Sequence, residues 1–288
     1  EVRNDGTNPV TDGNVVSGTL VGILVHDAAA GEHFRNDVSL CEHGIRVDGE
    51  ESSAALLDGN RVHECRQVGI HLLNDIAATC IVKNNVCESN VKAGILVELN
   101  ASPVLDGNTT VGGTTGISIV NYGMGVLARN DCSKALRAGI QISEWGAPMS
   151  LDGNLLHDNT GNGLKVVDGG SCAACCNNQF SNNLEAGCYV GEGCNPNLIG
   201  NTFFAGLSTG LHVTSRSSAL VQGNTFTGNA GYGLLVDNLA SSAVTGNTFK
   251  GPGNALGGCG VATKAVPRLE GNTFDGNTGP GIRVWSEG

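Results

Sequence analysis

The sequence predicts an all-β protein, a right-handed, single-stranded parallel β-helix: a solenoid of about twelve coils with about 23 residues each. An asparagine recurs at intervals of 22 to 25 residues along the whole chain of 288 residues. A glycine that opens a Gly-apolar-x-apolar segment recurs with the same period, and no stretch shows a helical period. Two registers that agree over twelve copies indicate a repeat architecture. The recurring asparagines are Asn14, Asn36, Asn60, Asn85, Asn108, Asn130, Asn154, Asn178, Asn201, Asn224, Asn247 and Asn272.

Each copy contains three short strand patterns that are separated by glycine, asparagine or serine. In the clearest copy they are Gly233–Val236, Ser242–Gly246 and Asn247–Phe249. Three strands and three turns in about 23 residues are typical of one coil of a parallel β-helix. A leucine-rich repeat has a similar length, but its Leu-x-x-Leu-x-Leu frame is missing from this sequence.

Apolar residues recur at two further fixed positions in each copy. The position two places after the asparagine ends in a run of five phenylalanines: Phe180, Phe203, Phe226, Phe249 and Phe274. The position three places before the asparagine is apolar from Leu57 onward. Because a solenoid buries its core in such columns, we expect both to point inward. The first two coils fit poorly, and between Asp27 and Asp37 only Phe34 comes near a core position.

The recurring asparagines are interpreted as a turn device and not as ligands. Asparagine tolerates left-handed backbone geometry better than most residues. Its amide can also form hydrogen bonds with the coils above and below. These bonds would satisfy polar groups of the turn that would otherwise be buried without a partner. We therefore expect a ladder of stacked asparagine side chains.

Composition limits the classes of partner. The chain carries 16 Lys and Arg against 27 Asp and Glu, a net charge of −11, and it has no basic run, so we expect no nucleic-acid partner. No apolar run of 18 residues is present, and we expect no membrane partner. A solenoid grows by adding coils, so residues 1–288 are expected to form a single domain. Because the sequence begins with Glu1 and starts and stops within the repeat, we expect it to be part of a longer protein.

The chain contains eleven cysteines, and most of them replace apolar residues of the columns. An odd number of buried thiols without obvious pairing favours a reducing, intracellular (cytoplasmic) location. The alternative is a zinc site at Cys172, Cys175 and Cys176 with Cys194 one coil away, although the second CxxC of a strong zinc signature is missing. Buried thiols are the preferred interpretation, and we expect no metal and no cofactor.

Several segments carry a resemblance to a known family. They are Ala101–Asn108 (ASPVLDGN), Cys194–Asn201 (CNPNLIGN), Ala265–Asn272 (AVPRLEGN) and the segment from Gly271 to Val284. The chain resembles the right-handed β-helix repeat family, of the kind shared by carbohydrate-binding and sugar-hydrolase modules and by the substrate-recognition domain of F-box-only proteins. The resemblance to F-box-only proteins implies a protein-binding scaffold. The sequence contains no F-box, and the motifs of polygalacturonases, pectate lyases and alginate epimerases are missing.

In β-helix proteins that act on sugar chains, the working surface is a groove along one sheet, and here the Gly-apolar-x-apolar strands would form it. A proton-transferring enzyme needs a base, an acid and a group that neutralises the uronate charge, whereas a hydrolase needs paired carboxylates. Asp48 and Glu98 are expected two coils apart, roughly 10 Å. The best cluster runs from Gln141 to His212. The candidate binding residues are Arg46, His71, Glu98, Gln141, Glu144, Trp145, Lys165, Asp168, Tyr189 and His212.

The sequence favours a non-catalytic scaffold that binds a protein partner, because charged and aromatic residues are scattered over this face. The alternative is a polysaccharide-active enzyme, a lyase, epimerase or hydrolase of acidic glycans, that uses the groove. A tight pocket with perturbed carboxylates on the Gly-apolar-x-apolar sheet would distinguish the two hypotheses.

Overall fold

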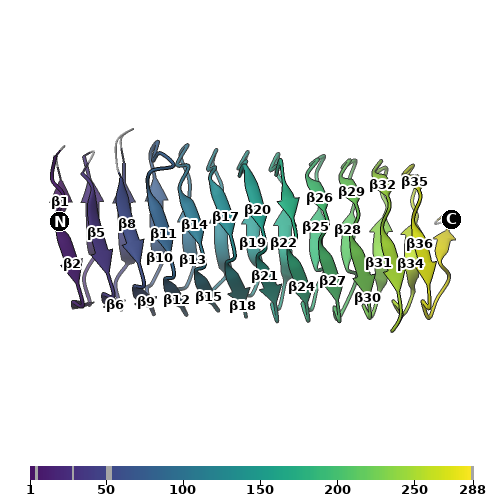
Figure 1. Ribbon diagram of the computed structural model, residues 1–288, viewed down its shortest axis with the longest axis horizontal. Coiled ribbons are helices and arrows are strands. Elements are labelled where there is room, and N and C mark those ends of the chain that lie inside the picture. Colours follow the sequence, from purple (N-terminus) through teal and green to yellow (C-terminus); the bar gives the residue numbers. More distant parts are fainter. Residues whose placement is uncertain (4–5, 28, 50–53, 287–288) are drawn as a thin grey trace.

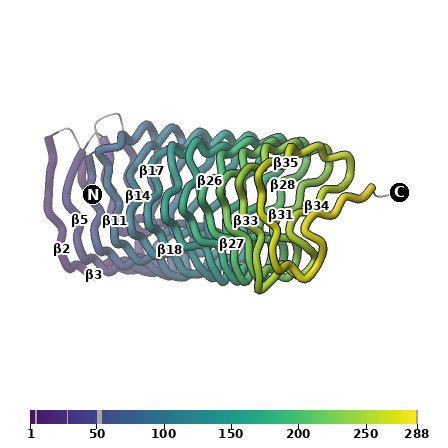
Figure 2. The backbone as a smooth tube through the Cα atoms, turned by 45° about the vertical axis from the view of Figure 1, so that its right-hand side comes forward, coloured from purple at the N-terminus to yellow at the C-terminus, as the bar shows by residue number. Residues whose placement is uncertain are grey.

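The computed structural model describes residues 1–3, 6–27, 29–49 and 54–286. It confirms the predicted fold, a parallel β-helix, because the described residues form three long parallel sheets and no helix. Figure 1 shows the coils stacked along one axis with the two ends of the chain at opposite ends of the solenoid. The tube in Figure 2 shows that successive coils follow nearly the same path.

The 13-stranded sheet, called sheet A, contains the Gly-apolar-x-apolar segments. Its strands, in spatial order, are β1 (Val2–Arg3), β4 (Val21–His26), β7 (His43–Asp48), β10 (Val68–Leu73), β13 (Ala93–Val97), β16 (Thr115–Ile119), β19 (Ala138–Ile142), β22 (Asn162–Val166), β25 (Cys188–Val190), β28 (Leu211–Val213), β31 (Tyr232–Val236), β34 (Gly257–Val261) and β37 (Ile282–Val284).

The two other sheets have twelve strands each. Sheet B contains β2 (Val10–Asp12), β5 (Gly31–Phe34), β8 (Ala55–Asp58), β11 (Ile81–Lys83), β14 (Val104–Asp106), β17 (Val126–Ala128), β20 (Ser150–Asp152), β23 (Cys175–Cys176), β26 (Asn197–Ile199), β29 (Leu220–Gln222), β32 (Ala243–Thr245) and β35 (Arg268–Glu270). Sheet C contains β3 (Val15–Ser17), β6 (Asp37–Ser39), β9 (Arg61–His63), β12 (Val86–Glu88), β15 (Thr109–Val111), β18 (Asp131–Ser133), β21 (Leu155–His157), β24 (Gln179–Ser181), β27 (Thr202–Phe204), β30 (Thr225–Thr227), β33 (Thr248–Lys250) and β36 (Thr273–Asp275).

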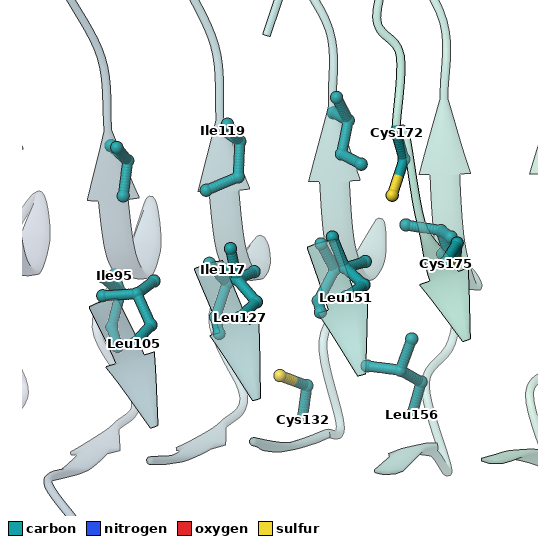
Figure 3. Packing of buried hydrophobic residues seen from close by; sticks show 14 of the residues in the cluster. Ile95, Leu105, Ile117, Ile119, Leu127, Cys132, Leu151, Leu156, Cys172 and Cys175 are labelled. Atoms are coloured by element: carbon teal, nitrogen blue, oxygen red, sulfur yellow. The ribbon is translucent and has the colours of Figure 1, made fainter. Parts of the chain in front are cut away.

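Both predicted apolar columns lie inside the solenoid. On sheet C the five phenylalanine rings stack nearly parallel, with ring centroids 4.6 to 4.8 Å apart. On sheet B, Leu105, Leu127 and Leu151 lie in register with one another and are fully buried, as Figure 3 shows. The glycine that opens each sheet A strand makes room for this core. A Cβ atom at Gly233 would lie 2.8 Å from Cδ1 of Phe249 and 2.9 Å from the carbonyl oxygen of Gly258.

The asparagine ladder is present, but its geometry differs from the prediction in one respect. Asn85 Nδ2 donates to Asn108 Oδ1 at 3.0 Å and to the carbonyl oxygen of Leu57 at 3.0 Å, while the Asn85 backbone N–H donates to Asn108 Oδ1 at 3.1 Å. None of the ladder asparagines has the expected left-handed backbone, since that conformation belongs to the residue before it. The left-handed residues are Gly13, Arg35, Gly59, Asn84, Gly107, Arg129, Gly153, Asn177, Gly200, Gly223, Gly246 and Gly271.

A second, shorter asparagine ladder lies at the turn between sheets C and A, and the sequence analysis missed it. Asn159 Nδ2 donates to Asn183 Oδ1 at 2.9 Å, and Asn229 Nδ2 donates to Asn254 Oδ1 at 2.7 Å. Both Asn159 and Asn183 stand five residues after an asparagine of the main ladder, so a search of that position would have found them. Cys41 and Cys65 occupy the same position in earlier coils.

The N-terminal coils contain one further departure from prediction. His33, and not Phe34, occupies the core position of sheet B, since His33 pairs in register with Leu57 and is fully buried. Phe34 is the next residue of β5, so it points to the other face of the sheet and is only half-buried.

All eleven cysteines are free thiols, and all except the half-exposed Cys176 are buried. Burial raises the pKa of the Cys65 thiol to about 11 and those of Cys80 and Cys132 to about 12. Figure 3 shows Cys172 and Cys175 among the buried apolar side chains. Within the described residues, no group of three or more His, Cys, Asp or Glu side chains is arranged to hold a metal ion.

Candidate functional site

The outer face of sheet A carries the candidate site. In each strand the side chain between the two inward apolar residues points outward, and so does the second residue after it. The pairing register places Gln141 beside Lys165, Lys165 beside Tyr189, and Tyr189 beside His212. A continuous row of outward side chains therefore runs along the solenoid axis, as predicted.

Four polar side chains from successive coils meet in the C-terminal half of this face, and we call them the acid–base row. They are Lys165 on β22, Tyr189 on β25, His212 on β28 and Asp237 directly after β31. Lys165 Nζ lies 5.7 Å from the centroid of the Tyr189 ring. The rings of Tyr189 and His212 meet edge to face, with centroids 5.5 Å apart. His212 Nε2 lies 3.1 Å from Asp237 Oδ2.

The surroundings of the row shift the pKa values of two of its members, Tyr189 and Asp237, in opposite directions. Burial, together with the nearby carboxylates of Glu192 and Asp237, raises the pKa of the Tyr189 hydroxyl, which stays protonated at neutral pH. Burial by itself raises the pKa of the Asp237 carboxyl, but the hydrogen bond with His212 and the nearby Thr214 side chain outweigh it and hold that pKa below its usual range. The row thus combines a fixed carboxylate, an imidazole, a proton-carrying phenol and a cation.

The N-terminal half of the face contains carboxylates that are already paired. Arg46 and Asn74 both donate to Asp48, each at 2.6 Å. His71 Nε2 lies 2.8 Å from Glu98 Oε1, and this hydrogen bond lowers the pKa of the Glu98 carboxyl. Glu98 is therefore held in the charged form, which does not suit a general acid, and both carboxylate oxygens of Asp48 already accept hydrogen bonds from neighbouring side chains.

The predicted cluster from Gln141 to His212 does not form a single site. Gln141 lies on the strand, where its Nε2 donates to Ser143 Oγ at 2.9 Å. Glu144, Trp145 and Asp168 instead lie on the turns that follow sheet A. Glu144 and Trp145 both have left-handed backbones, because a tight turn follows the strand directly and carries these side chains away from the row.

These turn residues line a separate hollow of about 500 Å³ with Asn121 and Tyr122, and Glu144 also borders the hollow in which Gln141 lies. Trp145 is 63% exposed and Tyr122 is 56% exposed. The sequence analysis missed Tyr122 on this surface and Asp237 in the acid–base row. Asp237 stands directly after its strand, as Glu98 does, and that shared position is the signal that could have identified it.

Two further hollows lie on the face of sheet A. One of about 640 Å³ covers the first coils and is lined by Arg46, Asp48 and Asn74 among others. The other, of about 350 Å³, covers β13, β16 and β19 and lies directly before the acid–base row in coil order. Within the described part of the chain there is no helix long and apolar enough to cross a membrane.

Comparison with known proteins supports the fold throughout. A family model described as "Right handed beta helix region" matches residues 21–177 and 139–288. No curated protein matches the sequence.

Two solved structures share the architecture of the chain. The A-module of the mannuronan C-5 epimerase AlgE6 from Azotobacter vinelandii is 15% identical, with a TM-score of 0.55 over 97% of this chain and 80% of that one. The catalytic unit of a GH87 α-1,3-glucanase from Streptomyces thermodiastaticus is 15% identical, with a TM-score of 0.63 over 99% of this chain and 65% of that one. At this level of identity the likeness shows the fold alone. Neither structure supports the expected likeness to F-box-only proteins.

Proposed function

This chain belongs to the right-handed β-helix family, and we propose that it acts on an acidic polysaccharide bound along the outer face of sheet A. The proposed reaction is proton transfer at C5 of a uronate residue, as in an epimerase or a lyase. The observation that carries this proposal is the acid–base row, in which Lys165, Tyr189, His212 and Asp237 meet from four successive coils.

Each member of the row has a role that follows from its surroundings. When His212 Nε2 donates its proton to Asp237, Nδ1 carries the lone pair that accepts the C5 proton of the sugar. Lys165 lies beside Tyr189 and offers a positive charge to the carboxylate of the same sugar. That charge stabilises the negative charge that develops when the proton leaves. Tyr189, whose pKa is raised, supplies a proton.

The same intermediate leads to either of two balanced outcomes. When the C5–H bond breaks, its electron pair moves toward the carboxylate and the proton passes to the imidazole. Return of a proton to C5 from the opposite face gives the epimer. Loss of the C4 oxygen, with a proton from Tyr189 to the leaving group, gives a C4–C5 double bond and a new chain end.

A hydrolase has less support. An inverting or retaining hydrolase needs a protonated carboxyl group with a raised pKa beside a second carboxylate. On sheet A, Glu98 has a lowered pKa and is paired with His71, while Asp48 is held by Arg46.

The scaffold function favoured by the sequence also has less support than the polysaccharide alternative. Both structural neighbours are named as enzymes of polysaccharides, an epimerase of mannuronan and an α-1,3-glucanase. No comparable observation points to a protein partner, so a glycan is the partner that we propose.

The test is to incubate the protein with polymannuronate, polyguluronate and polygalacturonate in D₂O. We expect deuterium at C5, measured by NMR, or unsaturated chain ends, measured by ultraviolet absorbance. Tyr189→Phe and His212→Gln should each lower the rate by roughly 10² to 10⁴. Tyr122→Phe, which changes a tyrosine outside the row, is the matched control and should leave the rate unchanged. Exchange that persists in both row variants, or that occurs with none of the three polymers, would contradict the proposal.

A further inference from the structure

The hollow of about 350 Å³ over β13, β16 and β19 has two walls of opposite character. Lys92 and Arg137, which stand directly before β13 and β19, form one wall. Glu98 and Glu144, which follow the same two strands, form the other, and Gln141 lies on the floor between them. The hollow is therefore lined by cations on one side and by carboxylates on the other.

The two cations of this hollow, Lys92 and Arg137, do not take part in ion pairs that stabilise the described part of the fold. Both are exposed, and neither makes a salt bridge with any residue that the structure describes. Several other cations on the solenoid are paired along the coils, for example Arg61 with Glu88 at 2.9 Å and Lys83 with Asp58 at 3.4 Å. Lys92 and Arg137 occupy the same position two coils apart, which places their backbones roughly 10 Å from each other.

The floor carries an independent sign of a missing partner. Gln141 is only 9% exposed, and its Oε1 atom is buried without a hydrogen-bond partner among the described residues, while its Nε2 is occupied by Ser143. A buried acceptor without a donor is destabilising and uncommon in folded proteins. If the amide rotates toward the hollow, a ligand hydroxyl would supply that donor.

The opposite wall is suited to the hydroxyl groups of a sugar. Glu98 is held in place by His71 at 2.8 Å, and its lowered pKa keeps it ionised, so its second oxygen accepts hydrogen bonds. A uronate ring presents a carboxylate on one edge and hydroxyl groups on the other. This arrangement of charge matches the two walls.

We propose that this hollow is the subsite that holds an anionic sugar residue next to the acid–base row. Lys92 and Arg137 bind carboxylates, and Gln141 and Glu98 accept hydrogen bonds from hydroxyl groups. The spacing of two coils fits an extended chain in which every second sugar turns its carboxylate to the same side. The proposal rests on the proposed function, because it takes the ligand to be an acidic glycan.

Isothermal titration with two probes tests the subsite. The probes are oligomannuronate and the same oligosaccharide with its carboxylates reduced to alcohols. We expect the acidic probe to bind and the reduced probe to bind at least tenfold more weakly. Lys92→Ala and Arg137→Ala should each weaken binding of the acidic probe about tenfold and make binding less sensitive to salt. Arg137→Lys should recover part of the loss, and Lys250→Ala, an exposed cation on sheet C, is the matched control.

Activity measurements on the same variants separate this proposal from the proposed function. We expect Lys92→Ala and Arg137→Ala to raise KM while kcat stays close to the wild-type value. Turnover by the wild type, combined with unchanged binding in both variants, would overturn the subsite and leave the function standing. Binding that depends on Lys92 and Arg137 without any turnover would support the subsite and remove the proposed reaction. An acidic probe that does not bind, or that binds no better than the reduced one, overturns the subsite.

Discussion

His33 is a titratable residue at a core position that Leu57 and Val82 fill in the next two coils. Its Nδ1 lies 2.9 Å from Thr11 Oγ1, while its Nε2 has no hydrogen-bond partner among the described residues. Burial lowers the pKa of this imidazole to about 4, so the folded protein keeps it neutral. The unfolded chain binds a proton at His33 near pH 6.5, and the folded chain does not do so until about pH 4.

This difference predicts a stability change with a defined direction. As pH falls from about 6.5 to 4, the unfolded state takes up the proton first, so stability decreases through that window and levels off below it. At pH 5 the loss attributable to His33 is about 2 kcal/mol relative to pH 7. His33→Leu should remove this loss, which thermal melting of both proteins at pH 7 and pH 5 measures. An equal shift in melting temperature for both proteins would show that His33 does not carry it.

Individual site residues were only partly predictable from the sequence. The outward positions of Lys165, Tyr189 and His212 follow from the strand period, which fixes every second side chain on one face. The contact between His212 and Asp237 does not follow from it, because it joins different positions on neighbouring coils. Trp145 was assigned to the same cluster because the turn that carries it away from the strand leaves no periodic signal in the sequence.

The phenylalanine stack forms part of the core of the C-terminal coils. Phe226 lies between Phe203 and Phe249 with ring centroids 4.8 and 4.7 Å away. Phe226→Ala should destabilise the protein by about 3 to 5 kcal/mol, because the cavity lies inside a column that cannot close around it. Chemical denaturation measures this. Phe204→Ala is the control, since Phe204 is next to Phe203 but points outward and is half-buried, and a similar loss in both variants would contradict the stacking argument.

The asparagine ladder depends on two adjacent residues with different tasks. Asn224 accepts hydrogen bonds from the backbone and side chain of Asn201 and donates to the carbonyl oxygen of Leu198. Asn224→Ala should cost about 2 to 5 kcal/mol, because these buried groups lose their partners. Gly223, which supplies the left-handed turn, should tolerate asparagine within about 1 kcal/mol, since asparagine adopts that conformation readily. Denaturation curves that show Gly223→Asn to be the more damaging change would reverse this assignment.

The architecture of the whole molecule was predictable because each coil repeats the same local solution. Ladder asparagines, inward columns and turn glycines recur at fixed places. A coil that departs from the pattern can therefore still be assigned from its neighbours. The left-handed residue was misassigned by one position because glycine and asparagine stand side by side in most copies, and both tolerate that backbone. The outer face of sheet A, which carries the candidate site, has no such repetition. Its residues differ from coil to coil, and only side-chain contacts show which of them meet.

The thiols are distributed from Cys41 to Cys259, and they therefore report on the integrity of the whole solenoid. Burial raises the pKa of most of the thiols, Cys176 included, because it disfavours the thiolate that reacts, but Cys176 alone is half-exposed and the other ten are buried. With a thiol-alkylating reagent in native buffer, we expect rapid modification of Cys176 alone, and modification of all eleven after denaturation. Mass spectrometry of peptides locates each label, and Cys176→Ser should abolish the fast phase.

Because each coil contacts only its neighbours, labelling at intermediate denaturant should spread between adjacent coils, and simultaneous exposure of distant thiols would instead indicate one cooperative unit. Disulfides in the freshly purified protein would contradict both the buried thiols and the expected reducing location.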